Sequence, residues 1–150
     1  ETNQTIVDIY SRYLFETEVI DTRADHAMNV DELKDAILRA QEASYGDGLD
    51  PEIRHPYMWA CKSHYYSSGY NFYNFPYAFG ELFAKGVFAQ YLQKGAAFVP
   101  DYCRLLRSCG SGTIADVAAS VGIDVRNPDF WRSSLEVVKG NIDKFCELVK

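Results

Sequence analysis

The chain has 150 residues, of which 47% are apolar and 24% charged, and this suits one soluble domain, long enough for a real core, better than two domains. Its formal net charge of −6 argues against a nucleic-acid partner, because phosphate binding needs clustered Lys and Arg. The sequence has no apolar run of about 18 residues and no N-terminal export signal, so we expect a cytoplasmic protein without a membrane partner.

The first third of the chain predicts two helices. Apolar residues recur at three- and four-residue steps between Ile6 and Ile20, as on one face of a long helix. Asn29 is a suitable N-cap for a second helix that should continue to Gly46. The glycines, acids and proline of residues 47–51 then break the chain.

The middle of the chain predicts two more helices around a hinge. A third helix is expected over residues 57–66, and Ser67, Ser68 and Gly69 (67–69) should form the hinge or a tight turn. A fourth helix should run from about Phe72 to Gln93. Pro76 is compatible with it only in the first turn or at a kink.

The last third predicts three helices, over residues 99–109, 113–122 and from 127 to the C-terminus, with Pro or Thr near their starts and Gly near two of their ends. No segment shows the strict alternation of a strand, so the predicted fold class is all-α.

The four cysteines follow no metal-binding pattern, since none forms a Cys-x-x-Cys pair. They are Cys61, Cys103, Cys109 and Cys146. In a chain without an export signal we expect reduced, half-buried thiols.

Residues 59–79 combine one histidine with many tyrosines. His64 is followed by Tyr65, Tyr66, Tyr70, Tyr73 and Tyr77. Because a buried tyrosine needs a partner for its hydroxyl, this density suggests donors directed at a polar ligand. The alternative is an aromatic core whose hydroxyls reach the surface, and composition alone favours that alternative.

The stretch HYYSSGYNFYNFPYAFGELFA, residues 64–84, strongly resembles the C-terminal part of oligoendopeptidase F, in the thimet oligopeptidase family of zinc metallopeptidases. Residues 11–59 are similar to the helices that follow the metal site in that family, and residues 86–138 to its closing helices. The resemblance thus covers nearly the whole chain. It implies a multi-helix C-terminal subdomain of a larger helical enzyme that cleaves short peptides in a deep channel.

The chain departs from the family at the metal site. The family holds zinc with His-Glu-x-x-His and a later Glu, whereas His26, His55 and His64 here belong to no such motif. The family order would put the zinc ligands before residue 1. We therefore expect residues 1–150 to bind no zinc alone, to be inactive alone, and to need the N-terminal remainder of the same polypeptide as partner.

The resemblance also implies roles for single residues. The family's histidine and tyrosines bind substrate and stabilise the oxyanion of peptide hydrolysis, as phenol and imidazole donors can. Tyr77 is the best match among the tyrosines, because Tyr77-x-x-x-Glu81 also recurs. The implied catalytic residues are His64, Tyr73 and Tyr77, and the implied substrate-binding residues are Tyr70, Gly69 and Ser68.

The remaining candidates are expected to be structural. His26 should be a solvated cap, and His55, before a proline, should hold a loop. Phe75 and Phe79 should pack. Three acids of the first helix are expected on a solvated face rather than beside a zinc site, namely Glu16, Glu18 and Asp21.

A non-catalytic alternative is a free-standing helical module that binds peptides or another protein. The enzyme requires a metal helix upstream in the same gene, while the module requires an initiator Met directly before residue 1. The first residue is not Met and the first helix starts without a cap, which favours the enzyme. In isolation, the Tyr and Phe side chains of residues 70–79 should drive self-association.

Overall fold

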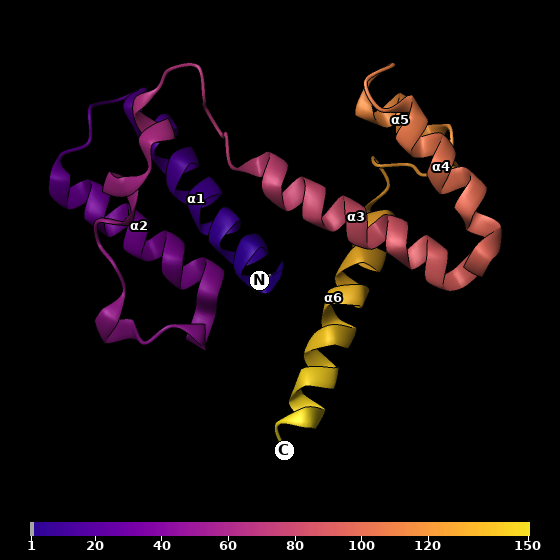
Figure 1. Ribbon diagram of the computed structural model, residues 1–150. Coiled ribbons are helices and arrows are strands. Elements are labelled where there is room, and N and C mark those ends of the chain that lie inside the picture. Colours follow the sequence, from indigo (N-terminus) through magenta and orange to yellow (C-terminus); the bar gives the residue numbers. More distant parts are fainter. Residues whose placement is uncertain (1) are drawn as a thin grey trace. The chain divides into compact units, whose positions relative to one another are not determined.

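All regular structure in the computed structural model, which describes residues 2–150, is helical, and this confirms the all-α prediction (Figure 1). The described chain divides into two compact units between Phe79 and Gly80, inside one helix. Each unit has its own apolar cluster. Each half of the chain therefore buries an apolar face of its own.

The first unit is built on two long helices, α1 (Thr2–Arg23) and α2 (Val30–Tyr45), which lie side by side in opposite directions (Figure 1). Asn29 caps α2 as predicted. Its Oδ1 accepts from the backbone N–H groups of Asp31 (2.9 Å) and Glu32 (3.0 Å), and Glu32 Oε2 accepts from Asn29 N (2.7 Å). The core between the helices contains Phe15, Ala36, Ile37 and Ala40, with Met58, Trp59 and Tyr65 packed against it.

Residues 46–74 return over this helix pair in short 3₁₀ helices, which are η1 (Gly46–Gly48), η2 (Pro51–Ile53), η3 (Met58–Cys61) and η4 (Ser63–Tyr66). The predicted α-helix over residues 57–66 is wrong, because the backbone is extended at Lys62 (φ −101°, ψ 92°). Residues six apart lie on different faces of an α-helix. The break lets both Trp59 and Tyr65 pack against the same core.

Helix α3 (Phe75–Lys94) begins three residues later than expected. Phe72, the predicted start, has a left-handed backbone (φ 54°) that cannot continue a right-handed helix. Pro76 lies in the first turn of α3, where its missing N–H leaves no helical hydrogen bond unmade.

The second unit contains the rest of α3 and the elements η5 (Gly95–Phe98), α4 (Val99–Ser108), α5 (Ile114–Ala119) and α6 (Pro128–Leu148). The three predicted C-terminal helices are confirmed, with ends shifted by a few residues. The core comprises Val87, Phe98, Leu105, Ala118, Val121, Ile123 and Phe130, and Trp131 packs against it.

Two further expectations concern the surface. No helix in the described residues is both long and apolar enough to cross a membrane. The four thiols are free, but only Cys103 is half-buried, while Cys61, Cys109 and Cys146 are exposed.

Candidate functional site

Four of the predicted site residues lie together, and we call His64, Tyr70, Tyr73 and Tyr77 the His–Tyr cluster. The ring of Tyr73 lies 5.8 Å from that of His64, 5.2 Å from that of Tyr70 and 5.9 Å from that of Tyr77, measured between centroids. The exposed fractions of Tyr70, Tyr73 and Tyr77 are 54%, 42% and 54%. These three tyrosines therefore form a surface group and no part of an aromatic core.

The hydroxyl oxygens of Tyr73 and Tyr77 lie 3.2 Å apart and share a hydrogen bond. This bond raises the pKa of Tyr73, because it favours the protonated phenol. Only one hydroxyl can donate within the pair, so the other keeps its hydrogen for a ligand. The pair thus offers one donor and free oxygen lone pairs at the surface.

Ser68 and Gly69 lie beside the cluster rather than within it. Both are exposed in a turn that is closed by a hydrogen bond from Tyr70 N to Ser67 O (3.0 Å). No hydrogen bond or ring contact joins either residue to the cluster. A Cβ added at Gly69 would meet no atom within 4 Å, so packing does not require glycine there.

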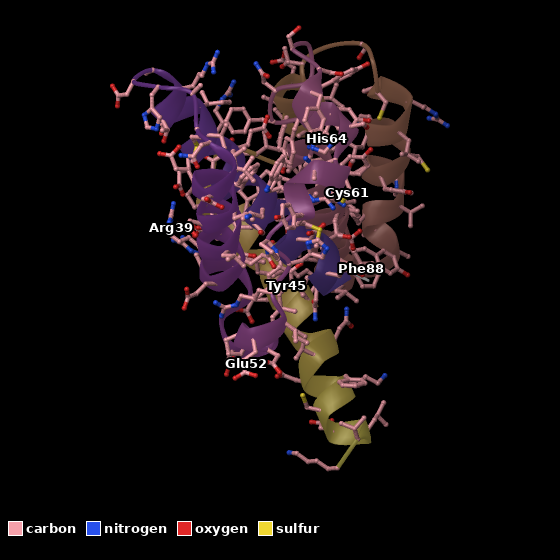
Figure 2. All side chains as sticks on the ribbon, turned by 90° about the vertical axis from the view of Figure 1, so that its left-hand side faces the viewer. Arg39, Tyr45, Glu52, Cys61, His64 and Phe88 are labelled. Atoms are coloured by element: carbon pink, nitrogen blue, oxygen red, sulfur yellow. The ribbon has the colours of Figure 1, made fainter. Side chains whose placement is uncertain are left out.

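His64 lies half-buried on η4, one short helix beyond Cys61 on η3 (Figure 2). Its Nε2 lies 2.6 Å from Nδ2 of Asn74, a residue only 5% exposed. Burial lowers the pKa of His64, and the positive charge of Arg12 lowers it further. The imidazole is therefore held toward its neutral form.

Beneath the cluster lies a charged face of α1 that the sequence analysis missed. Arg12 donates from Nη1 to Oδ1 of Asn74 (2.8 Å) and forms an ion pair with Asp8. Glu16 is only 8% exposed, and its Oε1 accepts from Phe72 N (2.6 Å). The prediction of a solvated face is thus wrong for Glu16. The four-residue spacing of Asp8, Arg12 and Glu16 puts their side chains on one face of a helix, but the same spacing is typical of a solvated face.

Glu16 stabilises the strained backbone of Phe72. Phe72 has a left-handed backbone, which costs a residue with a side chain about 1–3 kcal/mol unless its surroundings enforce it. The Glu16 carboxylate fixes the backbone of Phe72, and the ring of Tyr13 lies 5.6 Å from the ring of Phe72. Phe75, expected to pack, is 57% exposed, and its ring lies 6.3 Å from that of Phe79, one turn further along α3.

A hollow of about 120 Å³ lies under the same segment, between the two long helices and the 3₁₀ helices. Its lining includes Arg12, Tyr45, Lys62 and Tyr65. Two buried polar atoms of these residues, Nε of Arg12 and the hydroxyl of Tyr65, have no hydrogen-bond partner. Burial raises the pKa of Tyr65, so this phenol stays protonated.

The described part of the chain brings no three potential metal ligands together. His26 is exposed, as expected, but its side chain pairs with Glu32 (Nε2 to Oε1, 2.9 Å) rather than with the end of a helix. His55 is structural as predicted. Its Nδ1 accepts from Tyr57 N (3.1 Å), and its backbone N and O bond to Gln41 (3.1 and 2.9 Å).

Comparison with known proteins finds a similarity to oligopeptidase PepF of Bacillus subtilis (strain 168), with 27% identity over 105 residues. These residues are 70% of this chain and 15% of that protein, so the chain corresponds to a small part of its relative. A continuous stretch of 105 residues in a chain of 150 cannot begin after residue 46 or end before residue 105, and it therefore includes the His–Tyr cluster. No family model and no solved structure matches the chain.

Proposed function

We propose that this chain is the C-terminal helical part of a zinc-dependent oligopeptidase and supplies the residues that bind short peptides and stabilise the oxyanion. The observation that carries the proposal is the pair of exposed hydroxyls of Tyr73 and Tyr77, 3.2 Å apart beside His64. The pair lies inside the stretch that is similar to an oligopeptidase. A surface group of phenols around a half-buried imidazole is a poor core but a suitable set of donors.

Peptide hydrolysis converts a planar carbonyl into a tetrahedral intermediate with a negatively charged oxygen. A donor that reaches this oxygen stabilises charge that develops only in the transition state, and so raises turnover. In our proposal the free hydroxyl hydrogen of the Tyr73–Tyr77 pair donates to the oxyanion. His64 donates to the same oxygen or to a neighbouring substrate carbonyl, and the exposed ring of Tyr70 contacts the peptide.

Ser68 and Gly69 contribute through their backbone and position in this proposal. They form the exposed turn between η4 and the tyrosines, where a small conformational change would move Tyr70 relative to His64. We propose that this turn closes on the bound peptide and opens to release the products.

The residues present do not fit a zinc site, since no three potential ligands meet in the described residues and the sequence has no His-Glu-x-x-His. In our proposal the metal belongs to the N-terminal remainder of the same polypeptide. The chain alone should therefore be inactive toward peptides.

The test starts from the natural gene product, isolated from source cells with an antibody against this chain. We expect a product several times larger than 17.0 kDa that hydrolyses short peptides. In that product, Tyr77→Phe and Tyr73→Phe remove the two hydroxyls. Loss of an oxyanion donor typically lowers turnover by about 10²–10³-fold.

The matched control is Tyr102→Phe, which removes an exposed hydroxyl from α4 and should leave turnover unchanged. A natural product of 17.0 kDa would overturn the proposal and leave a peptide-binding module instead. Full turnover in the double variant Tyr73→Phe, Tyr77→Phe would overturn the assigned roles even in an active peptidase.

A further inference from the structure

A buried amide connects the cluster to the charged face of α1. Asn74 is only 5% exposed and lies directly before α3. Its Oδ1 lies 2.8 Å from Nη1 of Arg12, and its Nδ2 lies 2.6 Å from Nε2 of His64. The three side chains therefore form a continuous chain of hydrogen bonds from α1 to the imidazole.

The donor and acceptor of each bond follow from chemistry alone. The guanidinium of Arg12 can only donate, so the Asn74 atom facing it must be the carbonyl oxygen. The amide nitrogen of Asn74 must then face His64, and an amide NH₂ can only donate. Nε2 of His64 must accept this bond, and an accepting ring nitrogen carries no proton.

We propose that Asn74, oriented by Arg12, is a positioning residue that holds His64 as a neutral imidazole with its single proton on Nδ1. Nδ1–H is then the only donor that the ring can present to a substrate. The value of this donor to catalysis rests on the proposed function, but the protonation state itself belongs to the chain.

The charges around His64 are consistent with this state. Arg12 and Lys62 both oppose a positive imidazole, while Glu16 favours one. Burial is the largest single cause and acts with the two cations, so the pKa of His64 lies below the ordinary value for histidine. The other titratable groups packed on the ring are the phenols of Tyr65 and Tyr73, with ring centroids 4.4 and 5.8 Å away.

An amide orients a histidine in the opposite sense to a carboxylate. A carboxylate at position 74 would accept from the ring, require a proton on Nε2 and stabilise the imidazolium. Protonation of His64 beside Asn74 would instead set Nε2–H against an NH₂ group, so that two donors face each other. The arrangement thus favours a permanent hydrogen-bond donor over a group that cycles its charge.

The test is nitrogen NMR of the 150-residue chain with labelled histidines, since the ring nitrogens with and without a proton resonate far apart. We expect His64 to carry its proton on Nδ1 at neutral pH. His55 is an internal reference with the opposite tautomer, because its Nδ1 accepts from Tyr57 N (3.1 Å). The variant His64→Gln assigns the signals of His64.

Asn74→Asp replaces the donor with an acceptor of the same shape. We expect the proton of His64 to move to Nε2 and its pKa to rise by about one unit or more, as beside a new negative charge. Asn71→Asp is the matched control, because Asn71 is exposed and has no bond to His64. Arg12→Met should release the amide and give a mixture of both tautomers.

A proton on Nε2 of His64 in the unmodified chain would overturn the inference without any variant. If Asn74→Asp folds but leaves the proton position and the pKa of His64 unchanged, the inference is also overturned. If the Asn74→Asp chain does not fold, the His64 signals of the unmodified chain and of the Arg12→Met chain still test the inference. These signals do not depend on hydrolysis, so an inactive natural product with the expected tautomer would contradict the proposed function alone.

Discussion

Single side chains of α1 determine how the segment that carries His64 is held. Arg12 orients Asn74, and Glu16 accepts from the backbone of Phe72. Both bonds fix residues directly before α3, and both come from charged groups that are largely withdrawn from water. A buried charged acceptor with a short bond contributes more than an exposed ion pair on the same helix.

We expect Glu16→Ala to lower the free energy of unfolding by about 1–3 kcal/mol, because the half-buried N–H of Phe72 loses its acceptor. Glu18→Ala is the matched control, since Glu18 lies two residues away and only pairs with Arg39 at the surface. Glu18→Ala should lower the free energy of unfolding by less than about 1 kcal/mol. Urea titration measures both values, and equal losses would contradict the role of Glu16.

His64 should make stability depend on pH. Its pKa in the folded chain lies below the ordinary value of about 6.5, so the unfolded chain binds more protons near that pH. The stability linked to the neutral imidazole of His64 is therefore fully present above about pH 6.5. It is lost as the pH falls through the lower pKa that His64 has in the folded chain. Between about pH 7.5 and about pH 5.5 the urea midpoint should fall more for the unmodified chain than for His64→Gln. Parallel curves would contradict this.

The sequence allowed the prediction of the His–Tyr cluster but not of its support. His64 and the three tyrosines lie close in sequence, so the local pattern was enough to group them. The partners of Glu16 and Arg12 lie 56 and 62 residues away. No local pattern predicts such contacts, and exposed charge was the usual expectation for this spacing.

At the scale of elements, the second unit depends on a close contact between α3 and α6. A Cβ added at Gly86 would lie 2.4 Å from Cζ of Phe130 and 2.6 Å from Oγ of Ser134. Such distances do not occur in real structures, so α3 approaches α6 closely only because this position lacks a side chain.

We expect Gly86→Ala to destabilise the chain by about 1–3 kcal/mol, as overpacking of a dense core does. Gly140→Ala is the matched control inside α6, where the added Cβ meets no atom within 4 Å. At position 140 the higher helix propensity of alanine should raise the free energy of unfolding by about 0.5–1 kcal/mol. Thermal unfolding followed by circular dichroism measures both, and a stable Gly86→Ala chain would refute the close contact.

The elements were predictable where the chain carries local end signals. Asn29, Thr113 and Asn127 cap the helices that they were expected to begin. The 3₁₀ helices of residues 57–66 were not predictable, because two aromatic side chains of this segment, Trp59 and Tyr65, both pack against one core. Helix propensity is weaker than such tertiary packing.

At the scale of the whole molecule, each unit buries its own core and also exposes large apolar groups. In the first unit five of the exposed aromatics belong to the segment that carries the His–Tyr cluster, and they are Tyr66, Tyr70, Tyr73, Phe75 and Tyr77. We call these five side chains the aromatic patch, and exposed apolar side chains in such number mark an interaction site or a surface that associates with itself.

We expect the isolated 150-residue chain to self-associate at high concentration through this patch. The double variant Tyr70→Ser, Phe75→Ser should weaken the association, since both side chains are more than half exposed. Tyr10→Ser changes a comparably exposed aromatic on α1 and should leave it unchanged. Sedimentation velocity measures the outcome, and a clean monomer for the unmodified chain would refute the prediction.

The two tryptophans of the chain are divided between the cores, with Trp59 against the first and Trp131 against the second. Intrinsic fluorescence can therefore follow each half of the molecule separately once the other tryptophan is replaced by Phe. Ile37→Ala, which should cost about 2–5 kcal/mol, is expected to shift the emission transition of Trp59 more than that of Trp131. Phe98→Ala should shift the emission transition of Trp131 more than that of Trp59. Identical shifts of both transitions would mean that the two halves unfold in one cooperative step.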